Sequence, residues 1–165
     1  LVQEGDTVVI LGATGKSGLL CAYEAKKKVG PKGQVIGFGH TQSKCDKLEE
    51  LGFCDTIVRA DAGNAPECLQ AVSDITDSSM ADIVINCVNI PDTEMASILM
   101  CRNGGTVYFF SMATSFTKAA LGAEGVGKDV NMIIGNGYVK GHAEQALNIL
   151  RDSQPLRELY EKLYV

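Results

Sequence analysis

The stretch TVVILGATGKSG, residues 7–18, decides how this chain is expected to fold. Residues 7–11 form a short run, rich in β-branched side chains, that is apolar on both faces, as in a strand buried inside a parallel sheet. The run ends at Gly12. Residues 17–28 then place apolar side chains at helical spacing, with lysines in the last turn, and Gly30 and Pro31 predict the end of that helix. The stretch therefore predicts a buried strand, a glycine-rich turn and a helix.

The three glycines of this turn differ in what they permit. Gly12 allows a tight turn, Gly15 lets the backbone come close to a pyrophosphate, and Gly18 lets the helix pack against the strand. The N–H groups at the start of the helix and the positive end of its dipole favour phosphate binding. We therefore expect the whole turn to bind a dinucleotide: Gly12, Ala13, Thr14, Gly15, Lys16, Ser17 and Gly18. A plain strand–turn–helix unit without a ligand is the alternative.

The rest of the chain repeats the alternation of strand and helix. Further strands are expected at 34–38, 56–59, 81–88, 106–110 (after a turn at 103–105) and 130–134. Helices are expected at 43–51, 66–75, 92–101, 118–122, 141–151 and 156–164. This alternation predicts an α/β fold, a doubly wound six-stranded parallel sheet of the Rossmann type, in a single domain over residues 1–165.

The letters GKS at residues 15–17 also suggest a P-loop, which would bind a nucleoside triphosphate. That motif requires a glycine five positions before Gly15, where this chain has Ile10 inside the strand. It also requires a magnesium-binding Asp at the end of a later buried strand, where the best candidate has Asn86. The sequence therefore disfavours a P-loop NTPase, which stays as a lesser alternative.

The end of the second expected strand bears on which dinucleotide binds. NAD-preferring sites usually have an acidic residue here that binds the adenosine ribose. The first acid in this segment is Asp46, too far into the helix, and no arginine is present to clamp a 2′-phosphate. His40, Thr41 and Lys44 are the candidate cofactor-binding residues, with an ordinary helix cap as the alternative. We expect NAD as the cofactor, and the residues leave NADP open.

Topology adds candidates, because ligands on such sheets bind outside the carboxyl ends of the strands, where the strand order reverses. Asp61 is expected near the adenine. The remaining candidates are Asn86, Cys87 and Val88 beside the nicotinamide ribose, Phe110, Ser111 and Met112 near the nicotinamide, and Asn136 facing the reacting ring. The alternatives are a polar loop residue for Asp61, a core thiol for Cys87 and a strand cap for Ser111.

Composition argues against several classes of protein. The 165 residues are 45% hydrophobic and carry a net charge of −5, with no basic block beyond residues 26–28, so nucleic acid is not an expected partner. No apolar run approaches the roughly 20 residues of a membrane span. The six cysteines form no CxxC pair, and we expect them reduced, in the cytoplasm. With two histidines in the chain, we expect no metal site.

No catalytic residue can be assigned from the sequence. The only YxxxK match, Tyr23–Lys27, lies within the first expected helix, where Tyr23 is expected to face the core. His142 and Glu144 are more typical of solvated or capping residues. The chain begins with Leu1, and we expect it to be a piece of a longer protein whose other part supplies the acid–base groups.

Four segments resemble the cofactor domain of the medium-chain dehydrogenase/reductases, in the right order. They are VQEGDTVVILGA (2–13), LEELGFC (48–54), ADIVIN (81–86) and LMCRNGGTV (99–107). The resemblance implies an NAD(P)-dependent oxidoreductase whose substrate pocket comes from an N-terminal barrel-like domain, absent here, so that the isolated chain is inactive. It also implies a homodimer built through the sixth strand.

Two longer segments, 12–33 and 135–163, are similar to a narrower group, the L-erythro-3,5-diaminohexanoate dehydrogenases of lysine fermentation. This similarity implies a small amino-acid substrate, which is oxidatively deaminated to 5-amino-3-oxohexanoate with NAD. A zinc-type alcohol dehydrogenase or a quinone oxidoreductase of the same superfamily is one alternative. A non-catalytic nucleotide-sensing module is another, because the fold alone does not imply catalysis.

Overall fold

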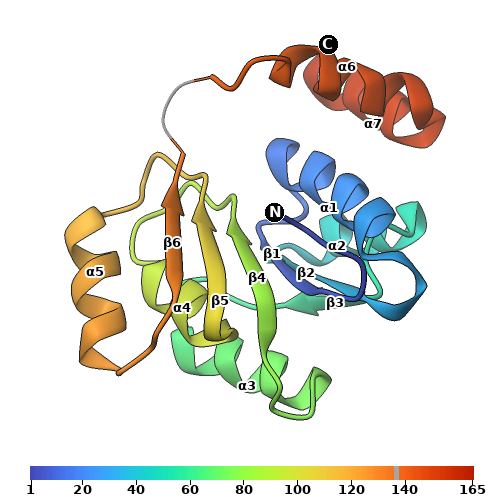
Figure 1. The fold of residues 1–165 in the computed structure, drawn as a ribbon. Coiled ribbons are helices and arrows are strands. Elements are labelled where there is room, and N and C mark those ends of the chain that lie inside the picture. The colour runs from blue at the N-terminus through green and yellow to red at the C-terminus, as the bar shows by residue number, and fades with distance from the viewer. Residues whose placement is uncertain (136–137) are drawn as a thin grey trace. The chain divides into compact units, whose positions relative to one another are not determined.

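The computed structural model describes residues 1–135 and 138–165, and its centre is a six-stranded sheet (Figure 1). All of the strand pairs are parallel, and the strand order is β3-β2-β1-β4-β5-β6. The strands are β1 Thr7–Leu11, β2 Gln34–Gly39, β3 Thr56–Arg59, β4 Ala81–Asn86, β5 Cys101–Phe109 and β6 Asn131–Ile134. The predicted doubly wound parallel sheet is confirmed.

The helices cover the sheet in two groups, and right-handed crossovers explain why. The order runs outward from β1 to β3, returns to β4 and then runs outward to β6, so the helices of the two halves lie on opposite faces (Figure 1). The helices of the sheet are α1 Lys16–Val29, α2 Gln42–Leu51, α3 Ala65–Ile75, α4 Glu94–Met100 and α5 Phe116–Gly125. α1 and α2 pack on β1 to β3, and α4 packs between α3 and α5.

The chain divides into two compact units, Leu1–Gly135 and Asn136–Val165. The first holds the whole sheet, α1 to α5 and a short 3₁₀ turn, Gly30–Lys32. The second holds two amphipathic helices, α6 His142–Asp152 and α7 Gln154–Tyr164, which pack against each other. Whether residues 1–165 behave as a single domain stays a prediction. No described helix is long and apolar enough to cross a membrane.

The centre and the edge of the sheet differ in burial. In β1 the four side chains Val8–Leu11 are completely buried, because β2 and β4 flank the strand and helices cover its faces. This explains why its sequence is apolar without alternation. At the edge strand β6, Ile133 and Ile134 keep 41% and 39% of their surfaces exposed. Among the described strands, β6 pairs only with β5. Its outer edge therefore carries main-chain groups without a strand partner, next to exposed apolar side chains.

Strand β5 begins at Cys101, five residues before the predicted start at Thr106. The glycines of the predicted turn lie inside the strand: Gly104 has φ +72°, and the register with β4 shifts between Ala81 and Ile83. A Cβ on Gly105 would lie 2.8 Å from the Asp82 carbonyl oxygen, so only glycine fits where the two strands approach. The prediction of a turn was wrong, because a β-bulge within a strand also needs glycine for a positive φ or for a close approach of two backbones.

Other boundaries moved for local reasons. Helix α5 runs from Phe116 to Gly125 and not over 118–122. Its earlier start follows from Ser115, which caps the helix by accepting a hydrogen bond from the N–H of Lys118. Strand β4 ends at Asn86 and not at Val88, because the Asn86 side chain accepts the Val88 N–H and turns the chain. Helix α4 begins at Glu94, two residues later than predicted.

Candidate functional site

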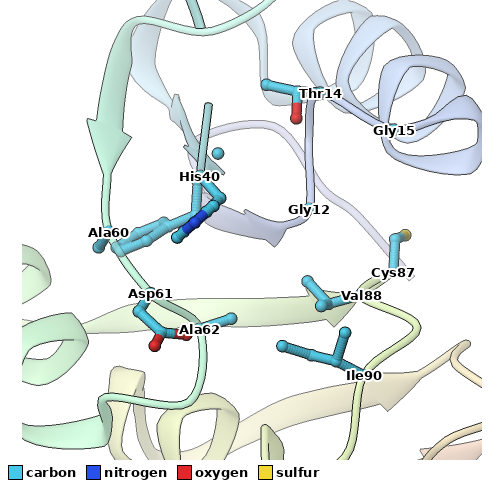
Figure 2. A pocket seen from close by; sticks show the side chains of 12 residues that line it. Gly12, Thr14, Gly15, His40, Ala60, Asp61, Ala62, Cys87, Val88 and Ile90 are labelled. Carbon is cyan, nitrogen blue, oxygen red and sulfur yellow. The ribbon is translucent and has the colours of Figure 1, made fainter. Parts of the chain in front are cut away.

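A cavity of about 220 Å³ opens at the carboxyl ends of β1 to β4, where the strand order reverses (Figure 2). Its lining comes from four separate segments, one at the end of each of these strands: Gly12, Thr14, Gly15, Phe38, Gly39, His40, Ala60, Asp61, Ala62, Cys87, Val88 and Ile90. Sequence reasoning had placed seven of these at a ligand site: Gly12, Thr14, Gly15, His40, Asp61, Cys87 and Val88. The cavity lies where open parallel sheets bind their ligands.

The turn after β1 has the geometry that its glycines predicted. Gly12 has φ +79°, and a Cβ there would lie 2.8 Å from the Cγ2 atom of Val88 on the opposite wall. The N–H groups of Gly12 and Ala13 both donate to the carbonyl oxygen of Phe38, at 3.1 and 2.9 Å, and tie the turn to the end of β2. Ala13 is fully buried and does not line the cavity.

Gly18 and Gly15 differ in how closely the rest of the protein packs against them. A Cβ on Gly18 would lie 2.0 Å from the carbonyl oxygen of Gly12, so glycine is needed there for α1 to pack against the turn. A Cβ on Gly15 would meet only that same oxygen, at 3.3 Å, and Gly15 has φ −87° and ψ 171°, which any residue adopts. The protein's own packing therefore constrains Gly15 much less than Gly18, and a ligand against the backbone is a further reason for a glycine there.

The start of α1 also differs from the starts of two other helices. Asn64 caps α3 and Ser115 caps α5 with side-chain hydrogen bonds, but Gly15 brings no side-chain cap to α1, and the first turn of α1 holds no acidic residue. Gly15 lines the cavity, so the positive end of this helix dipole faces open space. Lys16 and Ser17 follow at the start of α1 and are not part of the lining.

His40 and Asp61 face the cavity from the ends of β2 and β3 (Figure 2). The Asp61 carboxylate accepts the N–H of Gly63 at 2.9 Å, which orients it in its loop. Thr41 and Lys44 begin α2 beside His40, outside the lining. Sequence reasoning missed Arg59, which pairs in register with Gly39 and is exposed. An arginine therefore lies beside the end of β2. The sequence could have indicated it, because the expected second and third strands end next to each other in a parallel sheet, at residues 38 and 59.

Asn86 is completely buried and is held by its own neighbours. Its Nδ2 donates to the hydroxyls of Thr93 and Ser97, at 2.8 and 2.9 Å, and its Oδ1 accepts the Val88 N–H at 3.0 Å. The side chain does not line the cavity, so the structure gives it a role in shaping the loop that carries Cys87 and Val88.

Cys87 is a half-buried thiol in the cavity wall, opposite Cys21 of α1. The Cys87 thiol donates to the sulfur of Cys21, with 3.9 Å between the two Sγ atoms. This hydrogen bond lowers the pKa of Cys21, which accepts it, and raises the pKa of Cys87, which burial raises further. The two thiols therefore share their first deprotonation, and Cys21 takes the negative charge.

Phe110, Ser111 and Met112 follow β5 outside the cavity lining. Phe110 is 51% and Met112 98% exposed, and the Ser111 hydroxyl accepts the N–H of Ala113. A neighbour that the sequence did not reveal is Glu94, whose buried carboxylate accepts the N–H of Ser115 at 2.6 Å and so anchors the end of this segment. Asn136, predicted to face the reacting ring, lies outside the described residues.

Two curated relatives match every residue of the chain. It is 59% identical to the L-erythro-3,5-diaminohexanoate dehydrogenase of Acetoanaerobium sticklandii and 50% identical to that of Fusobacterium nucleatum. In each comparison the 165 matched residues make up 48% of the relative, so the chain spans about half the length of these proteins.

Solved structures share the fold at low sequence identity. The structure of a putative zinc-binding dehydrogenase from Sinorhizobium meliloti 1021 bound to NADP has a TM-score of 0.66 and 21% identity over 90% of this chain and 42% of that one. The alcohol dehydrogenase TADH from Thermus sp. has a TM-score of 0.64 and 22% identity over 93% of this chain and 40% of that one. At these identities the likeness shows the fold alone.

A family model described as zinc-binding dehydrogenase matches residues 18–150. Although that description implies zinc, residues 1–135 and 138–165 hold no group of three or more His, Cys, Asp or Glu side chains that could bind a metal ion. The described part of this chain therefore does not fit a zinc site. By its match over most of its length, the chain belongs to the zinc-binding dehydrogenase family, as an NAD(P)-binding domain of the medium-chain dehydrogenase/reductase type.

Proposed function

We propose that this chain is the coenzyme-binding part of an enzyme that oxidatively deaminates L-erythro-3,5-diaminohexanoate with NAD. The products are 5-amino-3-oxohexanoate and ammonia, and water supplies the ketone oxygen. Support comes from the identity of 59% and 50%, over every residue of the chain, to two proteins of that name. The single structural observation that carries the proposal is the cavity in which Gly15, less constrained by packing than Gly18, begins helix α1 without a side-chain cap.

In this proposal the turn from Gly12 to Gly18 holds the pyrophosphate of the coenzyme. Main-chain N–H groups at the start of α1 donate to the phosphate oxygens, and the helix dipole favours their charge. Gly12 keeps Val88 close to the turn, because a side chain at Gly12 would displace it. The pyrophosphate thus lies between the turn and the β4 end of the cavity.

His40 and Asp61 would bind the adenosine end, with Thr41 and Lys44 beside them at the start of α2. The Asp61 carboxylate is an acceptor for adenine or ribose donors. Arg59, next to Gly39 in register, is the residue to examine for a 2′-phosphate, because a guanidinium matches phosphate oxygens in pairs. NAD is the proposed coenzyme and NADP the second candidate.

Cys87 and Val88 would line the nicotinamide ribose, and Phe110, Ser111 and Met112 would follow near the ring. Bound NAD supplies a nicotinamide carbon that accepts hydride. The chain's part is to hold that carbon within roughly 3–3.5 Å of the substrate carbon that gives the hydride up. The groups that move protons would come from the other half of the protein, since this chain spans about half of its relatives.

We further propose a cytoplasmic homodimer in which the β6 edges of two copies pair. The exposed Ile133 and Ile134 beside an open strand edge support such a pairing. Light scattering at high micromolar concentration should give the mass of a dimer, and a Lys substitution at Ile133 should shift the protein towards monomer. A monomer under those conditions would overturn this part of the proposal.

The coenzyme proposal is tested by calorimetric titration of the protein with NADH, NADPH and ATP plus magnesium, side by side. We expect NADH to bind and ATP to bind at least tenfold more weakly. Tight magnesium-dependent ATP binding would instead support the P-loop alternative. Turnover of 3,5-diaminohexanoate by the full-length enzyme, with alcohols and quinones as competing substrates, tests the reaction. Coenzyme binding without turnover of any of these would favour a nucleotide-sensing module.

A further inference from the structure

Cys21 and Cys87 bring two sulfur atoms into contact at the wall of the coenzyme cavity. Cys21 lies in the second turn of α1, and Cys87 directly follows β4, 66 residues further along the chain. Their Sγ atoms are 3.9 Å apart. The N–H of Cys87 donates to the carbonyl oxygen of Leu11 at 2.9 Å, so its backbone is fixed to β1, the strand that leads into α1. The contact therefore joins two rigid elements.

A disulfide is within reach of small movements at this contact. The bond requires about 2.05 Å between the sulfurs, so they must approach each other by roughly 1.9 Å. Rotation about the Cα–Cβ bonds moves each Sγ, and both side chains border partly open space, since both cysteines are half-buried. Cys87 is part of the cavity lining, so its side chain is not packed on every side (Figure 2).

The other four cysteines make the pair stand out. Cys45, Cys68 and Cys101 are buried, and burial raises the pKa of Cys68 and of Cys101 to about 11. Cys54 is half-buried, but burial raises the pKa of its thiol to about 12. At Cys21, in contrast, the hydrogen bond from Cys87 lowers the pKa. Because the thiolate is the attacking form, we expect Cys21, and not Cys87, to attack first.

We propose that Cys21 and Cys87 are a redox-active pair, which a low-molecular-weight disulfide converts into an intramolecular disulfide at the wall of the coenzyme cavity. The Cys21 thiolate attacks one sulfur of the small disulfide, forms a mixed disulfide and releases one thiolate. Cys87 then loses its proton and attacks the Cys21 sulfur, which forms the Cys21–Cys87 bond and releases the second thiolate. The protein loses two electrons and two protons, and the small disulfide becomes two thiols.

Coenzyme binding should oppose this reaction, and this consequence rests on the proposed function. Cys87 lines the cavity beside Val88, so a dinucleotide in that cavity covers the thiol and blocks its rotation. With NADH at about ten times its dissociation constant, about one-tenth of the protein is free, and disulfide formation should slow about tenfold. The oxidation state of Cys21 and Cys87 would therefore depend on whether the coenzyme site is occupied.

The test treats the purified, reduced protein with glutathione disulfide and maps its peptides without reduction by mass spectrometry. Wild type should lose two free thiols, yield a linked peptide containing Cys21 and Cys87, and regain both thiols with dithiothreitol. Cys87→Ser, whose hydroxyl can still donate a hydrogen bond to Cys21, should stop at the first step, with glutathione on Cys21. Cys54→Ser, the matched change at the other half-buried thiol, should still form the link.

Failure of the link in wild type, or a Cys87→Ser protein that carries no glutathione on Cys21, would overturn the proposal. A link that forms equally fast with saturating NADH upholds the disulfide but counts against the coenzyme position. Loss of NADH binding in calorimetry, with the link intact, counts against the proposed function alone. The two ideas therefore fail separately.

Discussion

Two turns form facing walls of the cavity at the carboxyl ends of β1 to β4, and they are built in opposite ways. The turn after β1, residues 12–18, is shaped by missing side chains: Gly12 and Gly18 let the backbone come close to Val88 and to itself. The turn after β4 is shaped by side chains that are present and buried, since Asn86 holds Thr93, Ser97 and the Val88 N–H. A turn whose shape depends on glycines can be predicted from the spacing of those glycines in the sequence. A turn held by buried side-chain hydrogen bonds cannot be predicted in this way, because the sequence does not show which polar side chains will bond to each other.

The largest effect is expected where backbone meets backbone. Gly18→Ala would place a Cβ 2.0 Å from the Gly12 carbonyl oxygen and 2.7 Å from the Cα of Ala13, and neither atom belongs to a flexible side chain. The turn and α1 must separate, so we expect the free energy of unfolding to fall by about 3 kcal/mol or more. Urea denaturation followed by circular dichroism measures the change.

Gly125→Ala is the matched control, because a Cβ on Gly125, in α5, meets nothing within 4 Å. It should leave stability unchanged or raise it by up to about 1 kcal/mol. Equal stability of the two variants would mean that the turn after β1 adapts easily and that its glycines are not structural requirements.

The second prediction concerns the opposite wall. Asn86→Ala removes both the donor to Thr93 and Ser97 and the acceptor of the Val88 N–H, and leaves buried polar groups without their partner. We expect a loss of about 2–3 kcal/mol in the free energy of unfolding, together with weaker NADH binding, because Val88 lines the cavity. Asn89→Ala, at an exposed position three residues away, should change neither quantity. If the two Asn variants behave alike, the network does not shape this wall.

These two walls show how far the sequence could be read. The doubly wound parallel sheet followed from the alternation of apolar and amphipathic segments, because strands that alternate with helices predict that fold. The sequence also located Gly12, Gly18 and the cavity between β1 and β4. It placed Asn86 among the ligand contacts, whereas its side chain bonds within the protein, because one-dimensional spacing does not show whether a polar residue points into a cavity or into the core.

Arg59 and β5 were missed for related reasons. Arg59 became relevant only through its register with Gly39, which depends on where two strands end. The glycines at 104 and 105 support a bulge in β5 as well as they would a turn, and the sequence alone does not distinguish the two. Long-range pairing decides both features.

The third prediction separates ligand binding from stability within the glycine turn. At Gly15 the backbone conformation is open to any residue, but a Cβ would lie 3.3 Å from the Gly12 carbonyl oxygen, so we expect Gly15→Val to lower the free energy of unfolding by about 1 kcal/mol, less than Gly18→Ala. The branched side chain would stand where the pyrophosphate is proposed to lie. NADH affinity should fall more than tenfold, equivalent to about 1.4 kcal/mol, in calorimetry. Unchanged affinity would refute the assignment of the turn.

The smallest expected effect tests whether the polar wall acts as a network or as a set of separate bonds. Ser97→Ala removes one of the two acceptors of the Asn86 Nδ2 group, and Thr93 Oγ1 still accepts from that nitrogen at 2.8 Å. We therefore expect a loss of only about 1 kcal/mol in the free energy of unfolding, with NADH affinity close to that of wild type. Ser43→Ala, exposed in the first turn of α2, is the matched control and should be neutral. If Ser97→Ala instead costs as much as Asn86→Ala, the three side chains hold the loop only together, and the wall after β4 is as intolerant of single changes as the glycine turn it faces.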